Sequence, residues 1–252
     1  MLLNKALMNS LAICLVATMQ VRAGGLSVVV TFGDSAASQV NTAPKGYYEL
    51  LREALEKKGG AWEVYNVGGM GFTSSTALSN LRKVLEYKPA ITILHLGLGD
   101  ATPKMVDKRY EPIVFLERFV SNYTAVVRAL KASGTRVILA TPYYLPWTEE
   151  TRKIYTAPPF KPGDRDGLNA ILVRYVEAIR AIAKSEQVEL VDVHDIMRKG
   201  NGPAKAGWKF MYDSMRLNAA GHKLIADKLA EVIRKAPPSA GKTVIPGVKG
   251  GD

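Results

Sequence analysis

Segments with the pattern of a buried strand alternate along the chain with segments that have the spacing of an amphipathic helix. The continuous β-branched run at residues 26–32 is typical of a strand buried on both faces. Comparable runs predict further strands at 62–67, 90–98, 136–142 and 188–193. The intervening segments predict helices at 46–59, 74–87, 112–134, 166–186 and 218–234. Five strands separated by helices imply one three-layer α/β/α domain with a five-stranded parallel sheet.

The first 23 residues do not fit this alternation. Lys5 precedes a mostly apolar segment that ends at the small residue Ala23, which is typical of a secretory signal peptide. An N-terminal membrane anchor is the alternative. Because polar residues interrupt the apolar run, we expect no stable membrane insertion but cleavage near Ala23 and a secreted or periplasmic protein.

Cleavage would also remove Cys14, the only cysteine of the chain, so the mature protein would contain no disulfide. A lipid-modified cysteine is the alternative, but Ile13 is larger than the residue that such a modification requires before it. Residues 24–235 are then expected to form the folded domain. Residues 236–252 are rich in proline and glycine without periodicity, which predicts a disordered tail.

The chain is basic, with a formal net charge of +11, or +9 once Lys5 and Arg22 have been removed. Such a charge favours anionic surroundings through non-specific attraction. The basic residues are scattered among acidic ones and form no stripe with interleaved aromatic residues. We therefore expect no nucleic-acid partner.

Residues that could take part in catalysis or ligand binding follow the first three strands. They lie at the sheet edge where ligands of parallel α/β proteins bind. "FGDSAAS" places Ser35 on a strand-to-helix turn, where it is either a nucleophile or a helix cap. "NVGGMGFTSS", residues 66–75, contains glycines whose N–H groups suit an oxyanion or a phosphate. Its spacing fits neither a dinucleotide fingerprint nor a P-loop. "GLGDATP" follows the third strand and contains Gly99 and Asp100.

These stretches, together with "DSMRLNAAGHKLIADKLAEVI" before and along the last helix, resemble the four sequence blocks of the SGNH hydrolases, also called GDSL esterases and lipases. The blocks occur in family order and span residues 26–234. The resemblance implies a flavodoxin-like fold and hydrolysis of carboxylic esters, such as small-molecule esters or acyl groups on a glycan, by a serine nucleophile and without a cofactor.

The resemblance also implies roles for single residues. Ser35 matches the nucleophile, the backbone N–H groups of Ser35 and Gly71 match oxyanion donors, and Asp213 matches the acid that orients the catalytic histidine. Two positions depart from the pattern. Gly99 stands where the family has an asparagine whose amide donates to the oxyanion, and Arg216 stands where the family has the histidine.

Arg216 remains protonated at any relevant pH and cannot accept the proton of Ser35. Loss of the base in a serine hydrolase costs up to about a million-fold in rate, and loss of one oxyanion donor about a hundred-fold or more. Two functions therefore stay open: an ester hydrolase, or an inactive relative that binds an anionic or carbohydrate ligand through Arg216. Arg216→His, with Gly99→Asn added, is expected to restore or raise activity.

The chain has three histidines that could substitute as a base. His95 lies within the third strand and is expected to be a core residue. His194 follows the fifth strand at the carboxyl edge, where it is either a loop residue or a substitute base. His222 lies six residues after Arg216 and would face away from it on the last helix.

A metal site is not expected, because Asp100, Asp192, His194 and Asp195 lack the spacing of metal ligands. The long segment after the fourth strand, residues 143–160, is rich in aromatic residues and proline. It either lines the site, where it could contact a sugar or an acyl group, or only covers the surface.

Overall fold

The computed structural model describes residues 26–34, 43–57, 61–161, 163–200 and 209–236. The expected signal segment, residues 1–23, lies outside the described residues, and so does the expected tail apart from Ala236. The predicted nucleophile Ser35 also lies outside them, directly after the last described residue of its segment, Asp34.

A five-stranded parallel sheet with the strand order β2-β1-β3-β6-β7 forms the centre of the molecule. Its strands are β1 (Ser27–Gly33), β2 (Trp62–Asn66), β3 (Ile91–His95), β6 (Arg136–Ala140) and β7 (Glu189–Val191). The three central strands are almost completely buried, as their uninterrupted apolar sequences predict. The expected α/β fold and the five parallel strands are confirmed.

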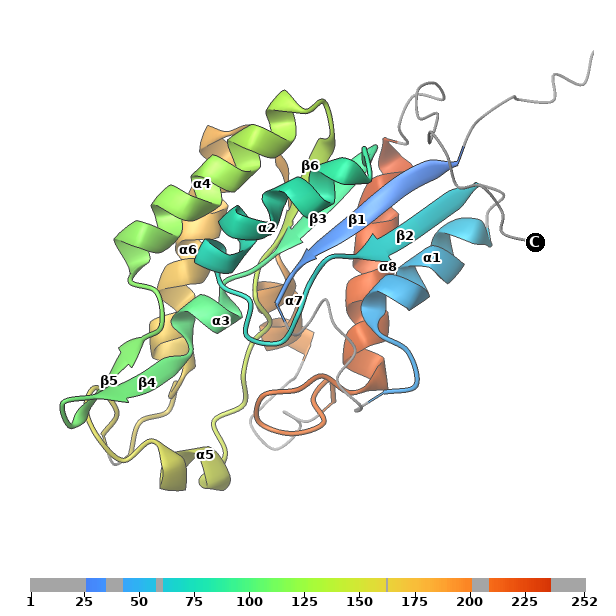
Figure 1. The fold of residues 1–252 in the computed structure, drawn as a ribbon. Coiled ribbons are helices and arrows are strands. Elements are labelled where there is room, and N and C mark those ends of the chain that lie inside the picture. Colours follow the sequence, from blue (N-terminus) through green and yellow to red (C-terminus); the bar gives the residue numbers. More distant parts are fainter. Residues whose placement is uncertain (1–25, 35–42, 58–60, 162, 201–208, 237–252) are drawn as a thin grey trace, which may run out of the picture.

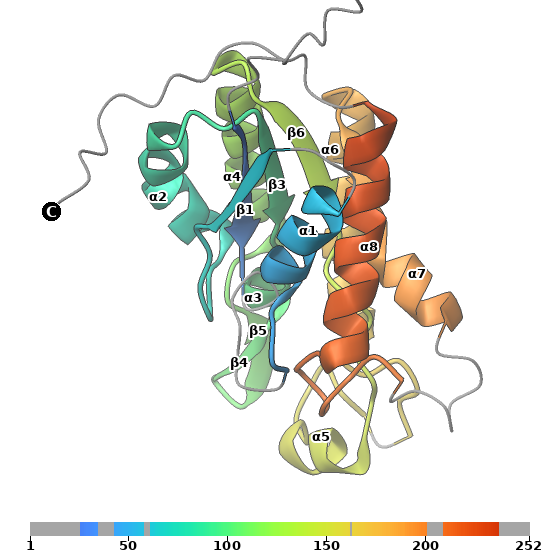
Figure 2. The same ribbon diagram turned by 90° about the vertical axis from the view of Figure 1, so that its right-hand side faces the viewer.

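Helices cover both faces of this sheet (Figure 2). On one face α1 (Tyr47–Glu56) packs against α8 (Ala219–Lys235). On the other, α2 (Ser74–Glu86) packs against α4 (Leu116–Ala132), and α4 packs against α6 (Asn169–Ser185). Each helix turns an apolar stripe to the sheet, so the two layers and the strands share one hydrophobic core.

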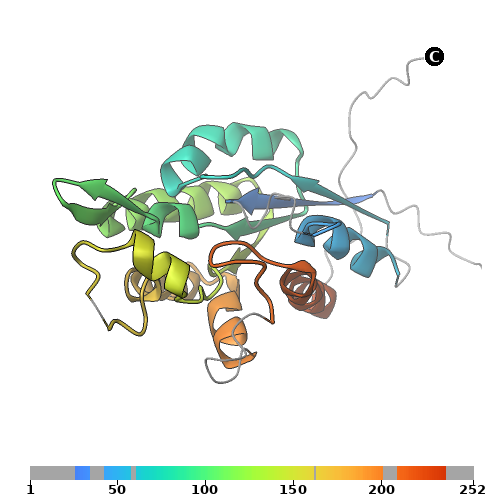
Figure 3. The same ribbon diagram turned by 90° about the horizontal axis from the view of Figure 1, so that it is seen from below.

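Additional elements gather below the carboxyl ends of the strands (Figures 1 and 3). They are α3 (Leu98–Ala101), the antiparallel pair β4 (Pro103–Val106) and β5 (Arg109–Pro112), and α5 (Glu149–Ile154). A further helix, α7 (Val193–Gly200), follows β7. The loop of residues 209–218, before α8, lies at the same edge. Apart from that loop, which contains the predicted residues Asp213 and Arg216, the sequence predicted none of these elements.

Several predicted boundaries were wrong by a few residues. The third strand ends at His95 rather than at residue 98, because α3 begins directly after Gly97, which has a φ of +119°. The fourth helix begins at Leu116 rather than at residue 112, since Pro112 belongs to β5. The N-cap of α2 is Thr73, whose side chain accepts the N–H of Thr76. No helix within the described part of the chain is long and apolar enough to span a membrane.

Candidate active site

A pocket of about 320 Å³, here called the edge pocket, opens at the carboxyl edge of the sheet. Segments that are far apart in the sequence form its walls: the end of β1, the loop after β2, α3 with the residue that follows it, and the loop before α8. The lining residues are Asp34, Met70, Gly71, Leu98, Gly99, Thr102, Met215 and Arg216. Three of the five predicted site residues therefore line one pocket.

The other two predicted residues are not among those lining residues. Asp213 does not line the edge pocket but is bonded to Arg216, which does. Ser35 lies outside the described residues, one position after Asp34 in the sequence.

The end of β1 is fixed by close contact with β3. A Cβ atom at Gly33 would lie 2.1 Å from the carbonyl oxygen of His95, so only glycine permits this approach. The next residue, Asp34, donates its N–H to the same carbonyl at 3.1 Å and accepts the N–H of Leu98 at 3.2 Å on Oδ2. Asp34 is buried, with 2% of its surface exposed. These bonds tie the residue before Ser35 to both β3 and α3.

The loop after β2 is tied to β1 in a similar way. The N–H of Val67 donates to the carbonyl of Thr31 at 2.8 Å, and the N–H of Gly69 donates to that of Gly33 at 3.1 Å. Gly71 has a φ of +75°, in the left-handed region that favours glycine. Its position on the wall of the edge pocket is thus set by main-chain bonds.

Gly99 is buried against this loop. A Cβ atom at residue 99 would lie 2.2 Å from the carbonyl oxygen of Phe72 and 3.6 Å from the carbonyl carbon of Gly71. A side chain here requires the Phe72 peptide to move. The expectation that Gly99→Asn simply adds an oxyanion donor is therefore wrong, because the main chain already occupies the space that the side chain needs.

Asp100 connects α3 to α2 rather than lining the edge pocket. It is fully buried and accepts the Ser74 N–H at 2.8 Å and the Ser74 hydroxyl at 2.6 Å. Burial raises the pKa of Asp100 to about 6, although the hydrogen bonds from Ser74 oppose that rise. Among the described residues, no three acidic, histidine or cysteine side chains are grouped so that they could hold a metal ion.

Asp213 and Arg216 form an ion pair beside the edge pocket. Nε and Nη2 of Arg216 both lie 2.6 Å from Oδ2 of Asp213, while the N–H groups of Met215 and Arg216 donate to Oδ1. Burial acts to raise the pKa of Asp213, but the hydrogen bonds from Met215 and Arg216 outweigh it and hold the pKa below its ordinary value. The Asp213 carboxylate is thus ionised and bonded to a guanidinium.

Side chains hold the loop that contains this ion pair. The Tyr143 hydroxyl donates to the Met215 carbonyl at 2.7 Å, and Met211 pairs with Leu217 across the loop. Asn218 accepts the N–H of Gly221 at 3.0 Å and thereby caps α8. The Arg216 guanidinium lies 5.1 Å from the centre of the Tyr212 ring.

The aromatic residues of the segment 143–160 do not form an open platform. Trp147, Tyr155 and Phe160 pack on one another and, with Tyr110 of β5, make a small core of their own. The segment nevertheless contributes to the site, because Tyr143 supports Met215. No residue of this segment lines the edge pocket itself, so its contribution there is indirect, through Met215.

The family model described as GDSL-like lipase/acylhydrolase matches residues 31–224. The chain belongs to this family. The edge pocket lies within the matched region, and so does the sheet apart from the first four residues of β1. No curated protein matches the chain.

Solved structures agree on the fold. A lipase/acylhydrolase from Enterococcus faecalis is 18% identical and has a TM-score of 0.66, with 86% of this chain and 100% of that chain covered. The acetyl xylan esterase AlAXEase is 22% identical, with a TM-score of 0.63 and coverage of 82% and 99%. The esterase EstA from Pseudoalteromonas sp., in a structure inhibited by monoethylphosphonate, is 20% identical, with a TM-score of 0.57 and coverage of 83% and 97%.

None of the three histidines of this family member lines the edge pocket. His95 is fully buried beside Tyr47, and His222 is buried on α8. His194 is a buried residue of α7, where it packs edge-on against Tyr144, and is not a loop residue. Burial lowers the pKa of His95 and of His222 to about 4 each. A histidine that could substitute as the base is therefore absent from the described lining.

The remaining lining residues were not predicted. Asp34 and Met70 are sequence neighbours of the predicted residues Ser35 and Gly71, so they could have been predicted to line the pocket. The same is true of Met215, which precedes Arg216. Thr102 could not have been predicted in this way, because its position depends on the short helix α3.

Proposed function

We propose that this chain is a serine ester hydrolase of the GDSL type that acts on carboxylic esters, including acyl esters on glycans. The supporting observation is the edge pocket, in which Gly71, Gly99 and Arg216 meet although they are distant in sequence. Asp34, the residue before Ser35, lines the same pocket. Acyl transfer requires a nucleophile next to N–H groups that can receive the developing oxyanion. No cofactor takes part in this chemistry.

In the proposed reaction the Ser35 hydroxyl oxygen attacks the ester carbonyl carbon. The N–H groups of Ser35 and Gly71 donate to the oxyanion, the alcohol leaves, and water then hydrolyses the acyl-serine. The main-chain bonds that tie the Gly71 loop to β1 support its role, because a fixed donor needs no rearrangement during the reaction.

Arg216 takes the position that the family resemblance gives to the catalytic histidine, and Gly99 that of the asparagine. In this proposal Arg216 adds positive charge beside the oxyanion but accepts no proton, so the Ser35 proton passes to water. Turnover is accordingly slow. Binding and oxyanion contacts alone leave an acceleration of the order of a thousand-fold over the reaction in water.

A second candidate is a site that binds an anionic or carbohydrate ligand without chemistry. It is favoured by the ion pair between Asp213 and Arg216, since the acid that would orient a histidine holds a guanidinium instead. A guanidinium presents several donors in a plane that suits carboxylate or phosphate oxygens.

We further propose that residues 1–23 are a signal peptide cleaved near Ala23, that residues 24–235 form the exported domain and that 236–252 form a tail. The start of β1 at Ser27 and of the family match at residue 31 support the first boundary. Mass spectrometry of exported protein should show an N-terminus near Gly24 and no cysteine. An intact N-terminus would contradict the cleavage.

The test of the hydrolase is the activity of the mature protein on short p-nitrophenyl esters. Activity should disappear in Ser35→Ala and remain in Ser79→Ala, a matched change at an exposed serine of α2. Activity that is equal in both variants would come from another site and contradict the assignment of Ser35. A wild type without activity that binds an acidic sugar, and loses that binding in Arg216→Ala, would support the second candidate.

A further inference from the structure

A small apolar recess, here called the side recess, adjoins the edge pocket. It has a volume of about 10 Å³. Its lining residues are Leu98, Ala101, Thr102, Pro103, Leu145, Leu168, Leu172 and Met215. Leu98, Thr102 and Met215 line both spaces, so the side recess lies beside the edge pocket, between α3 and the loop before α8.

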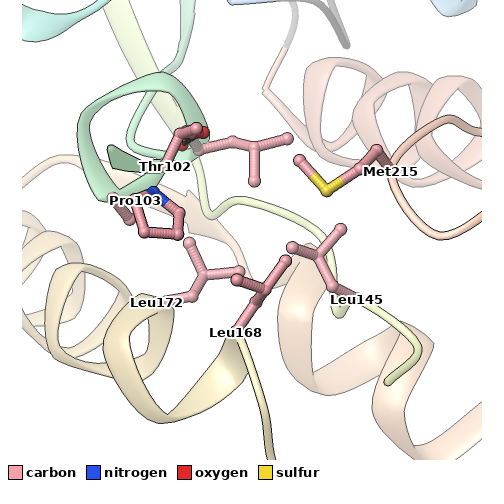
Figure 4. A pocket seen from close by; sticks show the side chains of 8 residues that line it. Thr102, Pro103, Leu145, Leu168, Leu172 and Met215 are labelled. Carbon is pink, nitrogen blue, oxygen red and sulfur yellow. Dashed lines mark hydrogen bonds between the residues drawn. The ribbon is translucent and has the colours of Figure 1, made fainter. Parts of the chain in front are cut away.

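The surface of the side recess is mostly apolar. Figure 4 shows the side chains of Pro103, Leu145, Leu168, Leu172 and Met215 pointing towards one another around it. The one polar lining side chain is that of Thr102, whose hydroxyl donates to the Leu98 carbonyl at 2.8 Å. That hydroxyl is already bonded within the protein, so the recess suits the apolar part of a ligand.

The walls of the side recess are fixed. Asn169, at the start of α6, accepts the N–H of Leu145 at 3.0 Å and donates to its carbonyl at 2.6 Å. The Tyr143 hydroxyl holds the Met215 carbonyl. Leu145 and Leu172 are buried, with 2% and 1% of their surfaces exposed. A rigid wall of this kind sets an upper limit on what can enter.

The geometry points to the side recess as the site of the acyl group, with acetyl esters as the preferred substrates. This inference rests on the proposed function, because it names the acyl group that the edge pocket presents to Ser35. A volume of about 10 Å³ accommodates about one group of the size of a water molecule. The methyl group of an acetyl ester meets that limit, whereas a longer acyl chain exceeds it and would press against Leu168, Leu172 or Met215.

The test compares p-nitrophenyl acetate, butyrate and octanoate as substrates of the mature chain. In the wild type, kcat/KM should fall about ten-fold or more from acetate to butyrate, since one methylene in an apolar pocket changes selectivity by at least about that factor. Leu172→Ala enlarges the recess and should reduce the acetate-to-butyrate ratio about ten-fold.

Leu229→Ala is the matched control, because Leu229 is a fully buried leucine of α8 that does not line the recess. It should leave the ratio unchanged. Met215→Ala, at a partly buried loop residue, tests the same idea if Leu172→Ala does not fold. A wild type that prefers butyrate, or a ratio that stays constant in both folded recess variants, would overturn the inference and leave the hydrolase standing.

A binding measurement distinguishes a failure of the recess assignment from a failure of the proposed hydrolase. Saturation-transfer NMR with acetate and octanoate on Ser35→Ala detects ligand binding in the recess without catalysis. Octanoate should gain signal relative to acetate when Leu172→Ala is added. If the wild type cleaves no ester but this gain is observed, the hydrolase fails and the recess assignment holds. Equal relative signals with and without Leu172→Ala would overturn the recess assignment.

Discussion

The edge pocket has two walls that differ in how far they depend on partly exposed side chains. The first wall, formed by residues 33–34, 66–72 and 97–101, is held by main-chain bonds and by glycines pressed against carbonyl groups. The second wall, the loop 210–218, has main-chain bonds within the loop and is also held by the side chains of Asp213, Tyr143 and Asn218. The close main-chain contacts of the first wall tolerate no added atoms, whereas the partly exposed pair of Asp213 and Arg216 in the second wall can accept substitutions.

The largest change in the free energy of unfolding is expected on acidification. His95 ends β3 and accepts the Asp34 N–H on its carbonyl, so its side chain lies behind the first wall. Burial lowers the pKa of His95 and His222 from 6.5 to about 4 in the folded protein.

Between pH 6.5 and 4 the unfolded chain binds more protons than the folded one, so the stability is complete above pH 6.5 and is lost as the pH falls. The loss should reach about 3 kcal/mol for each histidine, and the raised pKa of Asp100 offsets up to about one histidine's share, because the folded protein binds that proton before the unfolded chain does. Urea unfolding at pH 7, 5.5 and 4.5 measures the net loss, and His222→Leu should remove most of it. The second wall should behave differently, since the lowered pKa of Asp213 keeps its ion pair until the pH falls below 3.8. A stability that stays constant from pH 7 to 4.5 would contradict the burial of neutral imidazoles.

The next largest effect is expected at Gly99. Gly99→Ala places a Cβ atom 2.2 Å from the Phe72 carbonyl oxygen, and the displacement of main chain should cost about 3 kcal/mol. Gly134→Ala is the matched control: Gly134 has a φ of +82° and an open Cβ position, so only backbone strain of about 1 kcal/mol is expected. Thermal unfolding of both variants measures the difference. Equal losses would show that the first wall can relax.

The contact between Gly99 and Phe72 is an example of a feature that the sequence does not predict. The five strands were predictable because local patterns of buried β-branched residues specify them, and the blocks after β1, β2 and β3 were predicted to meet because parallel strands share a carboxyl edge. The approach of Gly99 to Phe72 is a contact between distant segments and leaves no local pattern. The β4–β5 pair and α3 were missed for a related reason: they are short and stabilised by what they pack against.

A smaller effect is expected at Asp213. Asp213→Asn removes the ion pair with Arg216 but keeps an oxygen that can accept the Met215 and Arg216 N–H groups. The two side chains are 35% and 44% exposed, so the loss should be about 1 kcal/mol or less. Thermal unfolding at low and high salt measures it, and the difference between wild type and variant should shrink in high salt. A loss above that of Gly99→Ala would reverse the comparison of the two walls.

The smallest change in stability, and the most informative change in activity, is expected for Arg216→His. Because the second wall is held by Tyr143 and Asn218 as well as by the ion pair, this substitution should change the free energy of unfolding by less than about 1 kcal/mol. Asp213 would then be placed to orient an imidazole beside the edge pocket. Ester hydrolysis should rise, with a pH dependence that follows a histidine pKa near 6.5, since the neutral imidazole is the working base.

Arg216→Lys is the control for this substitution, because lysine keeps the charge but accepts no proton at neutral pH, and it should not raise the rate. The gain should also vanish when Ser35→Ala is added to Arg216→His. Adding Gly99→Asn should lower the yield of folded protein rather than raise activity, because the first wall has no room for the side chain.

If Arg216→His folds and remains inactive, the second wall does not present residue 216 to the nucleophile, and the binding function becomes the better account of the pocket. If instead the wild type is fast and Arg216→His slows it, Arg216 itself serves the reaction, and the serine proton must pass to a group other than the residue at position 216.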